Sequence, residues 1–134
     1  MLGKLARHLR IFGFDTIYSA DLDDDQILRL AREGRAIVTR DRRLAERAWA
    51  RGLKAFLTRS TDLEQELREL VNARLVKKGE LKIGARCSLC NSELLERRDR
   101  TWVCPKCGQR YWIGGHWANI SKLMMRVGLL DEHQ

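Results

Sequence analysis

The residues with the clearest chemistry in this sequence are its four cysteines, which come in two pairs. Cys87 and Cys90 form the first pair, and Cys104 and Cys107 form the second. This spacing places two thiolates on one tight turn, and two such turns that face each other make the closed four-sulfur site typical of structural zinc. Gly108 follows the second pair, where such a turn often needs a positive φ. We therefore expect a bound zinc ion; iron is the second choice of metal, and two disulfides are the alternative without a metal.

Composition and charge limit the class of protein. The chain has 134 residues, of which 44% are hydrophobic and 33% are charged, and its formal net charge is +8. No apolar run approaches the roughly 20 residues that span a bilayer, and the first residues lack the pattern of a signal peptide. Zinc-type cysteines without these signals favour a cytoplasmic protein. The excess of positive charge favours nucleic acid as a partner, although a solvated basic face is the simpler alternative.

The second half of the chain carries more of the net positive charge and three of the four tryptophans. Residues 1–75 hold 15 Lys and Arg against 12 Asp and Glu, a balance of +3, whereas residues 76–134 hold 11 against 6, a balance of +5. Basic residues interleaved with aromatic ones suit RNA, because exposed bases stack on the rings. The predicted RNA contacts in this half are Trp112, His116 and Trp117. These side chains can instead fill a small core, and that alternative stays open.

Helices and strands must alternate along the first part of the chain to position its polar residues. Hydrophobic spacing predicts seven elements: helix 1–12, strand 14–18, a helix that ends at 33, strand 36–39, helix 42–51, strand 53–58 and a helix from 61 to about 75. Asp23 with Gln26, and Thr61 with Glu64, fit capping boxes at the starts of two of these helices. The alternation implies crossovers between parallel strands, and hence an α/β fold with a parallel sheet flanked by helices.

A linker over residues 76–83 is expected to divide the chain into two domains. The first is an α/β domain of residues 1–78, and the second is a zinc ribbon of residues 83–134 with a last helix after residue 117. Short β-prone pieces lie at 101–103 and 110–113. A module of about 50 residues buries little apolar surface. Its zinc, with an apparent binding free energy of about 10–16 kcal/mol, is therefore expected to decide whether it folds.

Carboxylates in the first half are the second group with possible chemistry. Asp41 follows one predicted strand and the acidic run at 21–25 follows another, and ligands of an open parallel sheet bind beyond these strand ends. Carboxylates clustered there can hold Mg²⁺ or Mn²⁺, which activates water and stabilises phosphodiester cleavage. The alternative is structural, because Asp41 and Asp23 are both good N-caps for the helices that follow them.

Basic residues near these carboxylates can hold phosphates. Lys4, Arg7 and Arg10 are spaced three apart and so share one stripe of the first helix, and Arg40 precedes Asp41. A phosphate-contacting stripe and an ordinary solvated face are both compatible with this spacing.

Six segments in chain order carry a resemblance to a known family. They are Met-Leu-Gly-Lys-Leu-Ala-Arg-His-Leu-Arg at 1–10, Gly-Phe-Asp-Thr at 13–16, Asp-Asp-Gln-Ile-Leu at 24–28, Thr-Arg-Asp at 39–41, Cys-Ser-Leu-Cys-Asn at 87–91 and Tyr-Trp-Ile-Gly-Gly-His-Trp at 111–117. Together they cover nearly the whole chain, and they resemble the PIN-like ribonuclease family named for the C-terminal domain of the mutator-seven exonuclease proteins.

The resemblance implies a PIN-type α/β nuclease domain fused to a zinc ribbon. It implies cleavage of RNA with a divalent metal at an acidic cluster. Matched position by position, the catalytic carboxylates are Asp24 and Asp41, with Asp25 as the substitute for Asp24, and the four cysteines are the ribbon ligands.

The start of the sequence departs from the family pattern. Family members begin with a short apolar strand that ends in an aspartate, just before the helix that starts here at Met1. In PIN-type domains that strand is central in the sheet, and its aspartate is a principal metal ligand. Either the natural protein is longer, or this is a truncated form that keeps only RNA binding. From the chain as it stands we expect weak or absent catalysis.

The sequence thus predicts a metal-dependent ribonuclease whose zinc ribbon docks RNA. A non-catalytic RNA-binding or ribosome-binding protein is the alternative. A protein-interaction module that uses the ribbon is a third reading.

Overall fold

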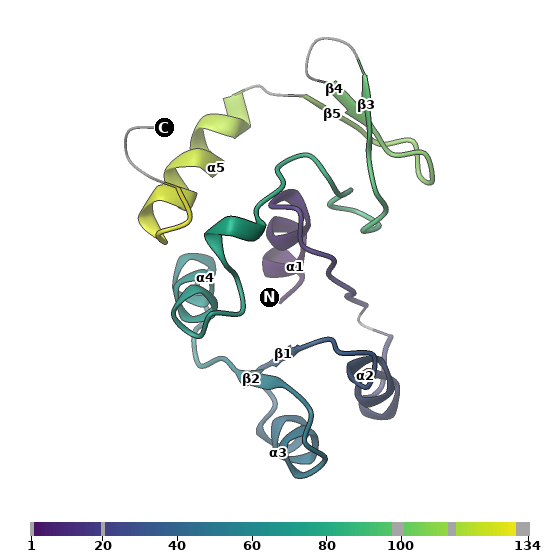
Figure 1. Cartoon of the computed structure of the whole chain (residues 1–134), viewed down its shortest axis with the longest axis vertical. Coiled ribbons are helices and arrows are strands. Elements are labelled where there is room, and N and C mark those ends of the chain that lie inside the picture. The colour runs from purple at the N-terminus through teal and green to yellow at the C-terminus, as the bar shows by residue number, and fades with distance from the viewer. Residues whose placement is uncertain (1, 20, 98–100, 113–114, 131–134) are drawn as a thin grey trace.

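The computed structural model describes residues 2–19, 21–97, 101–112 and 115–130, apart from the side chains of residues 97, 115 and 116 (Figure 1). The helices in these residues are α1 (Leu2–Ile11), α2 (Asp24–Ala31), α3 (Arg42–Ala50), α4 (Leu63–Asn72) and α5 (Gly115–Arg126), with one 3₁₀ turn at Lys78–Glu80. The strands are β1 (Ile37–Thr39), β2 (Ala55–Leu57), β3 (Leu95–Arg97), β4 (Thr101–Val103) and β5 (Arg110–Trp112). Among these helices none is long and apolar enough to cross a membrane.

The expected α/β fold is confirmed. β1 and β2 pair in parallel, with Val38 opposite Phe56, and α3 makes the crossover between them. β3, β4 and β5 form a separate antiparallel sheet in that order, which carries the cysteine turns. One apolar cluster lies between the parallel pair and its neighbouring helices α2 and α3, and its buried members are Leu28, Ala31, Ile37, Leu44 and Ala48.

The larger core joins the two halves of the chain. It contains buried side chains of α1, of α4 and the residues after it, and of α5 and the residues after it. These are Leu5, Leu9, Phe12, Leu67, Leu70, Val76, Leu123, Met124, Val127 and Leu129. The last helix of the ribbon half therefore shares one core with α1 and α4 of the α/β half, while the division at residues 78 and 83 stays a prediction.

The segment between the halves is packed against α1. The Lys82 N–H donates to the Phe12 carbonyl at 2.8 Å, and Val76 is buried. Gly13 makes this approach possible, since it has a φ of +99° and a Cβ there would lie 2.4 Å from the Lys82 carbonyl oxygen.

Two predictions about local structure were wrong, and one strand was missed. Residues 14–18 are extended but are not a strand, because no other strand of the described chain lies beside them to complete a ladder. The N-cap of α4 is Asp62, whose carboxylate accepts from the Gln65 N–H, and not Thr61. Strand β3 was not predicted, because its sequence Leu-Glu-Arg carries little β-preference and depends on pairing with β4. The capping box of Asp23 and Gln26 is confirmed at α2.

Candidate metal centre and acidic edge

The two cysteine turns have the same backbone hydrogen bonds. In the first, the Asn91 N–H donates to the Cys87 carbonyl at 2.9 Å, and in the second the Gly108 N–H donates to the Cys104 carbonyl at 2.9 Å. Asn91 and Gly108 both follow the second cysteine of their pair and both have a positive φ, of 68° and 80°. Asn and Gly are the residues that adopt this conformation most readily, so the sequence favours both turns locally.

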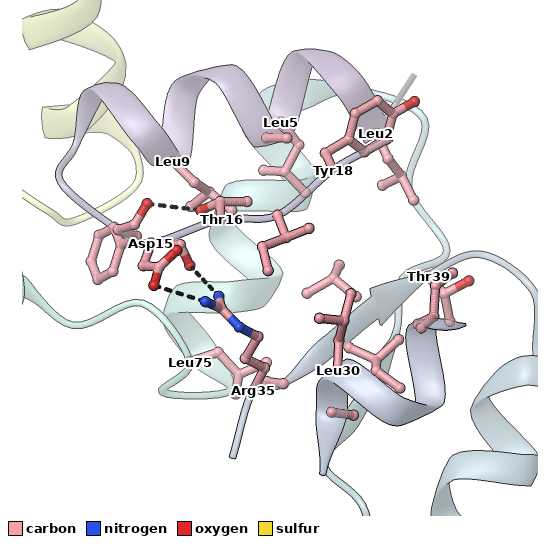
Figure 2. A pocket seen from close by; sticks show the side chains of 18 of the residues that line it. Leu2, Leu5, Leu9, Asp15, Thr16, Tyr18, Leu30, Arg35, Thr39 and Leu75 are labelled. Carbon is pink, nitrogen blue, oxygen red and sulfur yellow. Dashed lines mark hydrogen bonds and ion pairs between the residues drawn. The ribbon is translucent and has the colours of Figure 1, made fainter. Parts of the chain in front are cut away.

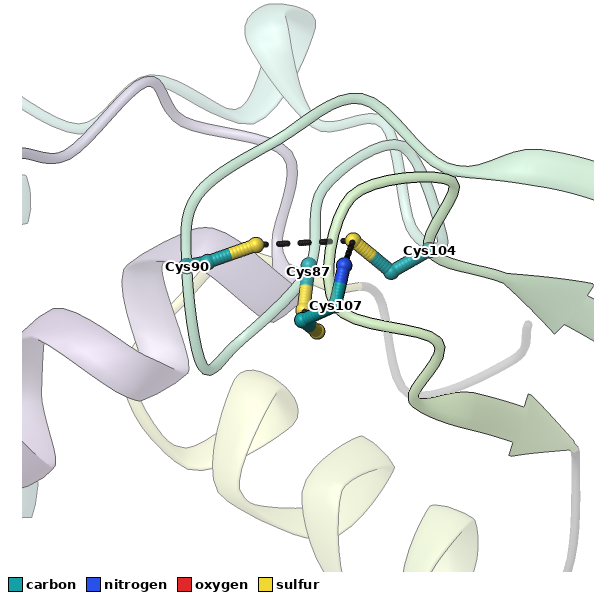
Figure 3. Close-up of side chains that lie close together, drawn as sticks. All are labelled: Cys87, Cys90, Cys104 and Cys107. Carbon is teal, nitrogen blue, oxygen red and sulfur yellow. Dashed lines mark hydrogen bonds between the residues drawn. The ribbon is translucent and has the colours of Figure 1, made fainter.

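The four sulfur atoms lie close together, on side chains of both cysteine turns (Figure 3). The Sγ atoms of Cys87 and Cys107 are 3.6 Å apart, those of Cys90 and Cys104 are 3.4 Å apart, and all four lie within 4.8 Å of one another. Tetrahedral zinc with sulfur ligands at about 2.3 Å separates them by about 3.8 Å. The four thiols are free, which argues against the disulfide alternative, and together they can hold a metal ion such as zinc.

The electrostatics of these thiols also favour a cation between them. Hydrogen bonds from the side chain and backbone of Ser92 lower the pKa of Cys90 to about 6. At Cys107 the Gln109 N–H lowers the pKa, but desolvation and the three neighbouring thiols outweigh it and raise the pKa to about 12. Four thiolates this close repel one another, and a divalent metal removes that repulsion.

Tyr111 of β5 is a contact of the metal centre that the sequence did not reveal. Its hydroxyl lies 3.0 Å from the Cys87 Sγ and accepts from the Ser88 N–H at 3.0 Å. Burial raises the pKa of this hydroxyl, so it stays protonated and can donate to the thiolate. Outer contacts of this kind orient a metal ligand and tune its affinity.

Arg10 of α1 connects the first cysteine turn to the α/β half. Its Nη1 donates to the carbonyls of Ser88 at 2.9 Å and Leu89 at 3.3 Å, and its Nε donates to the Thr16 carbonyl at 2.9 Å. The residue is only 7% exposed. The stripe predicted on α1 is therefore divided, because Lys4 and Arg7 are exposed to solvent while the Arg10 guanidinium contacts the protein's own backbone.

Asn91 makes a second connection at the same place. Its Oδ1 accepts from the Thr16 N–H at 2.9 Å, and its Nδ2 donates to Asp15 at 2.6 Å. Asp15 also pairs with Arg35 at 2.9 Å, and this hydrogen bond lowers the pKa of its carboxyl group. The first cysteine turn is thus bound to the extended segment 14–18 by side chains from both halves.

The carboxylates predicted to be catalytic lie at the starts of two neighbouring helices. Asp41 is the N-cap of α3, and its Oδ1 accepts from the N–H groups of Arg43 and Leu44. Asp24 and Asp25 open α2, and Arg47 of α3 pairs with both, at 3.5 and 2.8 Å. The Arg47 hydrogen bond lowers the pKa of Asp25. We call Asp24, Asp25 and Asp41 the acidic edge.

The acidic edge does not form a metal-ligand cluster like that of the cysteines. Among the described residues, the four cysteines are the one group of three or more possible ligands with atoms close enough to share an ion. Arg40, predicted to hold phosphate, donates to the buried Glu66 carboxylate at 2.9 Å and to the Ser60 carbonyl at 3.0 Å. These partners come from segments distant in the sequence, so local spacing gave no signal for them.

The predicted RNA contacts of the ribbon lie in different surroundings. Trp112 of β5 is 69% exposed and follows the exposed Arg110 by two residues, whereas Trp117 of α5 is half-buried. The side chain of His116 lies outside the described residues.

A family model described as the Mut7-C RNAse domain matches residues 1–124. The chain belongs to the Mut7-C RNAse domain family. This match spans the α/β half, both cysteine turns and most of α5, so the family resemblance seen in the sequence is confirmed. It connects the chain to RNA and to nuclease chemistry. Neither the curated proteins nor the solved structures contain a match to the chain.

Proposed function

We propose that this Mut7-C family member is a metal-dependent ribonuclease with its catalytic site at the acidic edge. The match to the RNAse domain over residues 1–124 carries this proposal. Asp24 and Asp41 would hold Mg²⁺ or Mn²⁺, with Asp25 as the substitute for Asp24. Such a metal supplies an activated water and stabilises the charge that develops on the phosphodiester. In this role the carboxylates of the acidic edge would bind the cation. To do so they would have to break their present hydrogen bonds and ion pairs.

The present contacts of the acidic edge support only weak catalysis. Two backbone N–H groups donate to the Asp41 Oδ1, and the single positive charge of Arg47 pairs with both Asp24 and Asp25. A cation must compete with these donors, and three carboxylates provide only part of the ligands of an octahedral metal.

RNA docking is proposed for the exposed basic and aromatic groups. Lys4 and Arg7 on α1 are exposed and can contact phosphates, and Trp112 with Arg110 on β5 offers a ring for base stacking. Binding through phosphates predicts an affinity that falls steeply with salt concentration, because bound cations are released from the RNA.

A pair of matched substitutions tests the catalytic site. Asp41→Asn removes a charge but keeps a good N-cap, since Asn and Asp cap helices about equally well. Asp62→Asn is the control, because Asp62 caps α4 in the same way, away from the acidic edge. We expect Asp41→Asn to abolish the weak Mg²⁺- or Mn²⁺-dependent cleavage of single-stranded RNA by the purified protein without changing its fold, and Asp62→Asn to leave the cleavage unchanged. Equal cleavage by both variants would reject the acidic edge as the catalytic site.

A non-catalytic RNA-binding or ribosome-binding protein is the second candidate. The observation that favours it is the contrast between four converging cysteines and carboxylates that are bound to caps and to Arg47. It predicts salt-sensitive RNA binding that survives Asp41→Asn, with no cleavage in the presence of any divalent metal.

A further inference from the structure

The first cysteine turn holds both backbone groups of Thr16, in the extended segment between α1 and α2. The Thr16 N–H donates to the Asn91 Oδ1 at 2.9 Å, and the Thr16 carbonyl accepts from the Arg10 Nε at 2.9 Å. Arg10 donates in turn to the carbonyls of Ser88 and Leu89. The backbone at Thr16 is therefore anchored at three positions of one turn, either directly or through the Arg10 guanidinium.

All three anchors lie where a bound metal would fix the backbone. Ser88 and Leu89 are the two residues between Cys87 and Cys90, and Asn91 follows the second cysteine. The Asn91 N–H closes the turn on the Cys87 carbonyl. Metal ligation holds both sulfurs at about 2.3 Å from one ion, and so holds the short backbone between them. The thiols are free, so no disulfide supplies this constraint. The positions of the anchors therefore depend on the metal.

The contacts continue from Asn91 to the start of β1. The Asn91 Nδ2 donates to Asp15 at 2.6 Å, and Asp15 pairs with Arg35 at 2.9 Å (Figure 2). Arg35 lies two residues before β1, and together with Asp15 it lines an apolar groove of about 370 Å³ beside that strand. Arg86 adds a hydrogen bond to the Asn91 carbonyl at 2.9 Å. A connected set of polar contacts thus joins the metal centre to the α/β half.

The extended segment has few other contacts that could hold it. Among the described residues, the backbone hydrogen bonds of residues 15–18 are made to Asn91, Arg10 and Arg35 alone. No strand of the described chain pairs with this segment. Because the first two of these three partners belong to the cysteine turn or are bound to it, loss of that turn leaves the segment with little support.

We propose that metal binding at the ribbon fixes the segment between α1 and α2, with Asn91 as the positioning residue. When zinc closes the first cysteine turn, Asn91 and Arg10 hold Thr16; when zinc is removed, the anchors separate and residues 15–18 are released. β1 and β2 keep their pairing, because no buried member of the apolar cluster beside them comes from the ribbon half. The released segment leads to α2, whose first residues belong to the acidic edge. This coupling is independent of any nuclease activity.

Residue-resolved hydrogen exchange of the full chain, with zinc and after its removal by a chelator, tests the coupling. We expect the Thr16 amide to exchange about tenfold faster without zinc, because its hydrogen bond to Asn91 is lost. The Thr58 amide, which donates to the Thr39 carbonyl at 2.9 Å, should change by less than about twofold. Equal acceleration at both amides would overturn the inference in favour of unfolding of the whole chain, and unchanged exchange at Thr16 would also overturn it.

Matched variants at the two cysteine turns isolate the Asn91 side chain. Asn91→Gly removes that side chain and keeps the positive φ. In the zinc-loaded variant the Thr16 amide should exchange about tenfold faster, with less than about twofold further change after chelation.

Gly108→Asn is the control at the equivalent position of the second turn. A Cβ at Gly108 meets no atom within 4 Å, and Asn tolerates its φ of 80°. Thr16 exchange in this variant should depend on zinc as in the unmodified chain. Full zinc dependence in Asn91→Gly would overturn the role of Asn91. If Asn91→Gly binds no zinc, the comparison of the Thr16 and Thr58 amides in the unmodified chain still decides.

Discussion

At the ribbon, four thiols from two turns converge within 4.8 Å, whereas at the acidic edge the carboxylates are bound to other groups of the protein. Asp41 caps α3, and Asp24 and Asp25 both pair with Arg47. The cysteine centre gains further support from outside, because Ser92 and Tyr111 bond to its sulfurs and Arg10 holds the carbonyls of its first turn.

The cysteines and the carboxylates differ in how much of their arrangement is fixed by the local backbone. A C-x-x-C turn fixes two ligands within four residues, and a left-handed Asn91 or Gly108 closes each turn. Carboxylates at helix starts obtain no such local geometry, and the nearest backbone N–H groups compete for them. The ribbon is therefore prepared for a metal, whereas a cation at the acidic edge must displace existing contacts.

Removing the metal should destabilise the protein more than any other change proposed here. A small effect would contradict the contrast drawn between the cysteine centre and the acidic edge. Chelation, or Cys87→Ser, should unfold the β3–β5 sheet, because about 10–16 kcal/mol of apparent metal-binding free energy is lost. Zinc content and hydrogen exchange of β3–β5 measure this. Asp41→Asn is the comparison at the other site and should leave exchange unchanged. Full protection of the β4 and β5 amides from hydrogen exchange in the absence of metal would show that the ribbon folds without its metal.

The Arg10 contacts should have the next largest effect. Arg10→Ala removes charge-assisted hydrogen bonds to partly buried carbonyls and should lower the free energy of unfolding by about 1.5–3 kcal/mol. Arg7→Ala, at an exposed position of the same helix, should change it by less than about 0.5 kcal/mol. Denaturant unfolding of the zinc-loaded protein measures both. Equal effects of the two variants would mean that the cysteine turn does not depend on α1.

Removing the ion pairs of Arg47 should have the smallest effect of the three changes. It tests whether Arg47 competes with a cation for the carboxylates of the acidic edge. Arg47→Ala frees Asp24 and Asp25, and raises the pKa of Asp25 toward its ordinary value. We expect Mn²⁺ to bind up to about fivefold more tightly, since solvent-exposed ion pairs are weak and their loss removes only a small competing interaction. Arg68→Ala is the control, because Arg68 has the same 41% side-chain exposure and pairs with Glu64 elsewhere. Calorimetric titration with Mn²⁺ that fails to separate the variants would contradict competition by Arg47.

Several features could be predicted from the sequence because their causes are local. The helices followed from hydrophobic spacing, the capping box of α2 from Asp23 and Gln26, and the left-handed turn from Gly108. The two strands β1 and β2 followed from short apolar runs between helices. The four-cysteine centre followed from two spacings of the same kind.

The sequence by itself therefore determined the helices, the capping box of α2 and the two cysteine turns, because each depends on contacts within a few residues of the chain. Only the tertiary structure decided that Arg10 serves the cysteine turn and that Arg47 occupies the acidic edge, since these partners are distant in sequence. It also decided that residues 14–18 stay unpaired beside an apolar groove. A strand requires backbone partners from another segment, and no local pattern can reveal whether those partners are present.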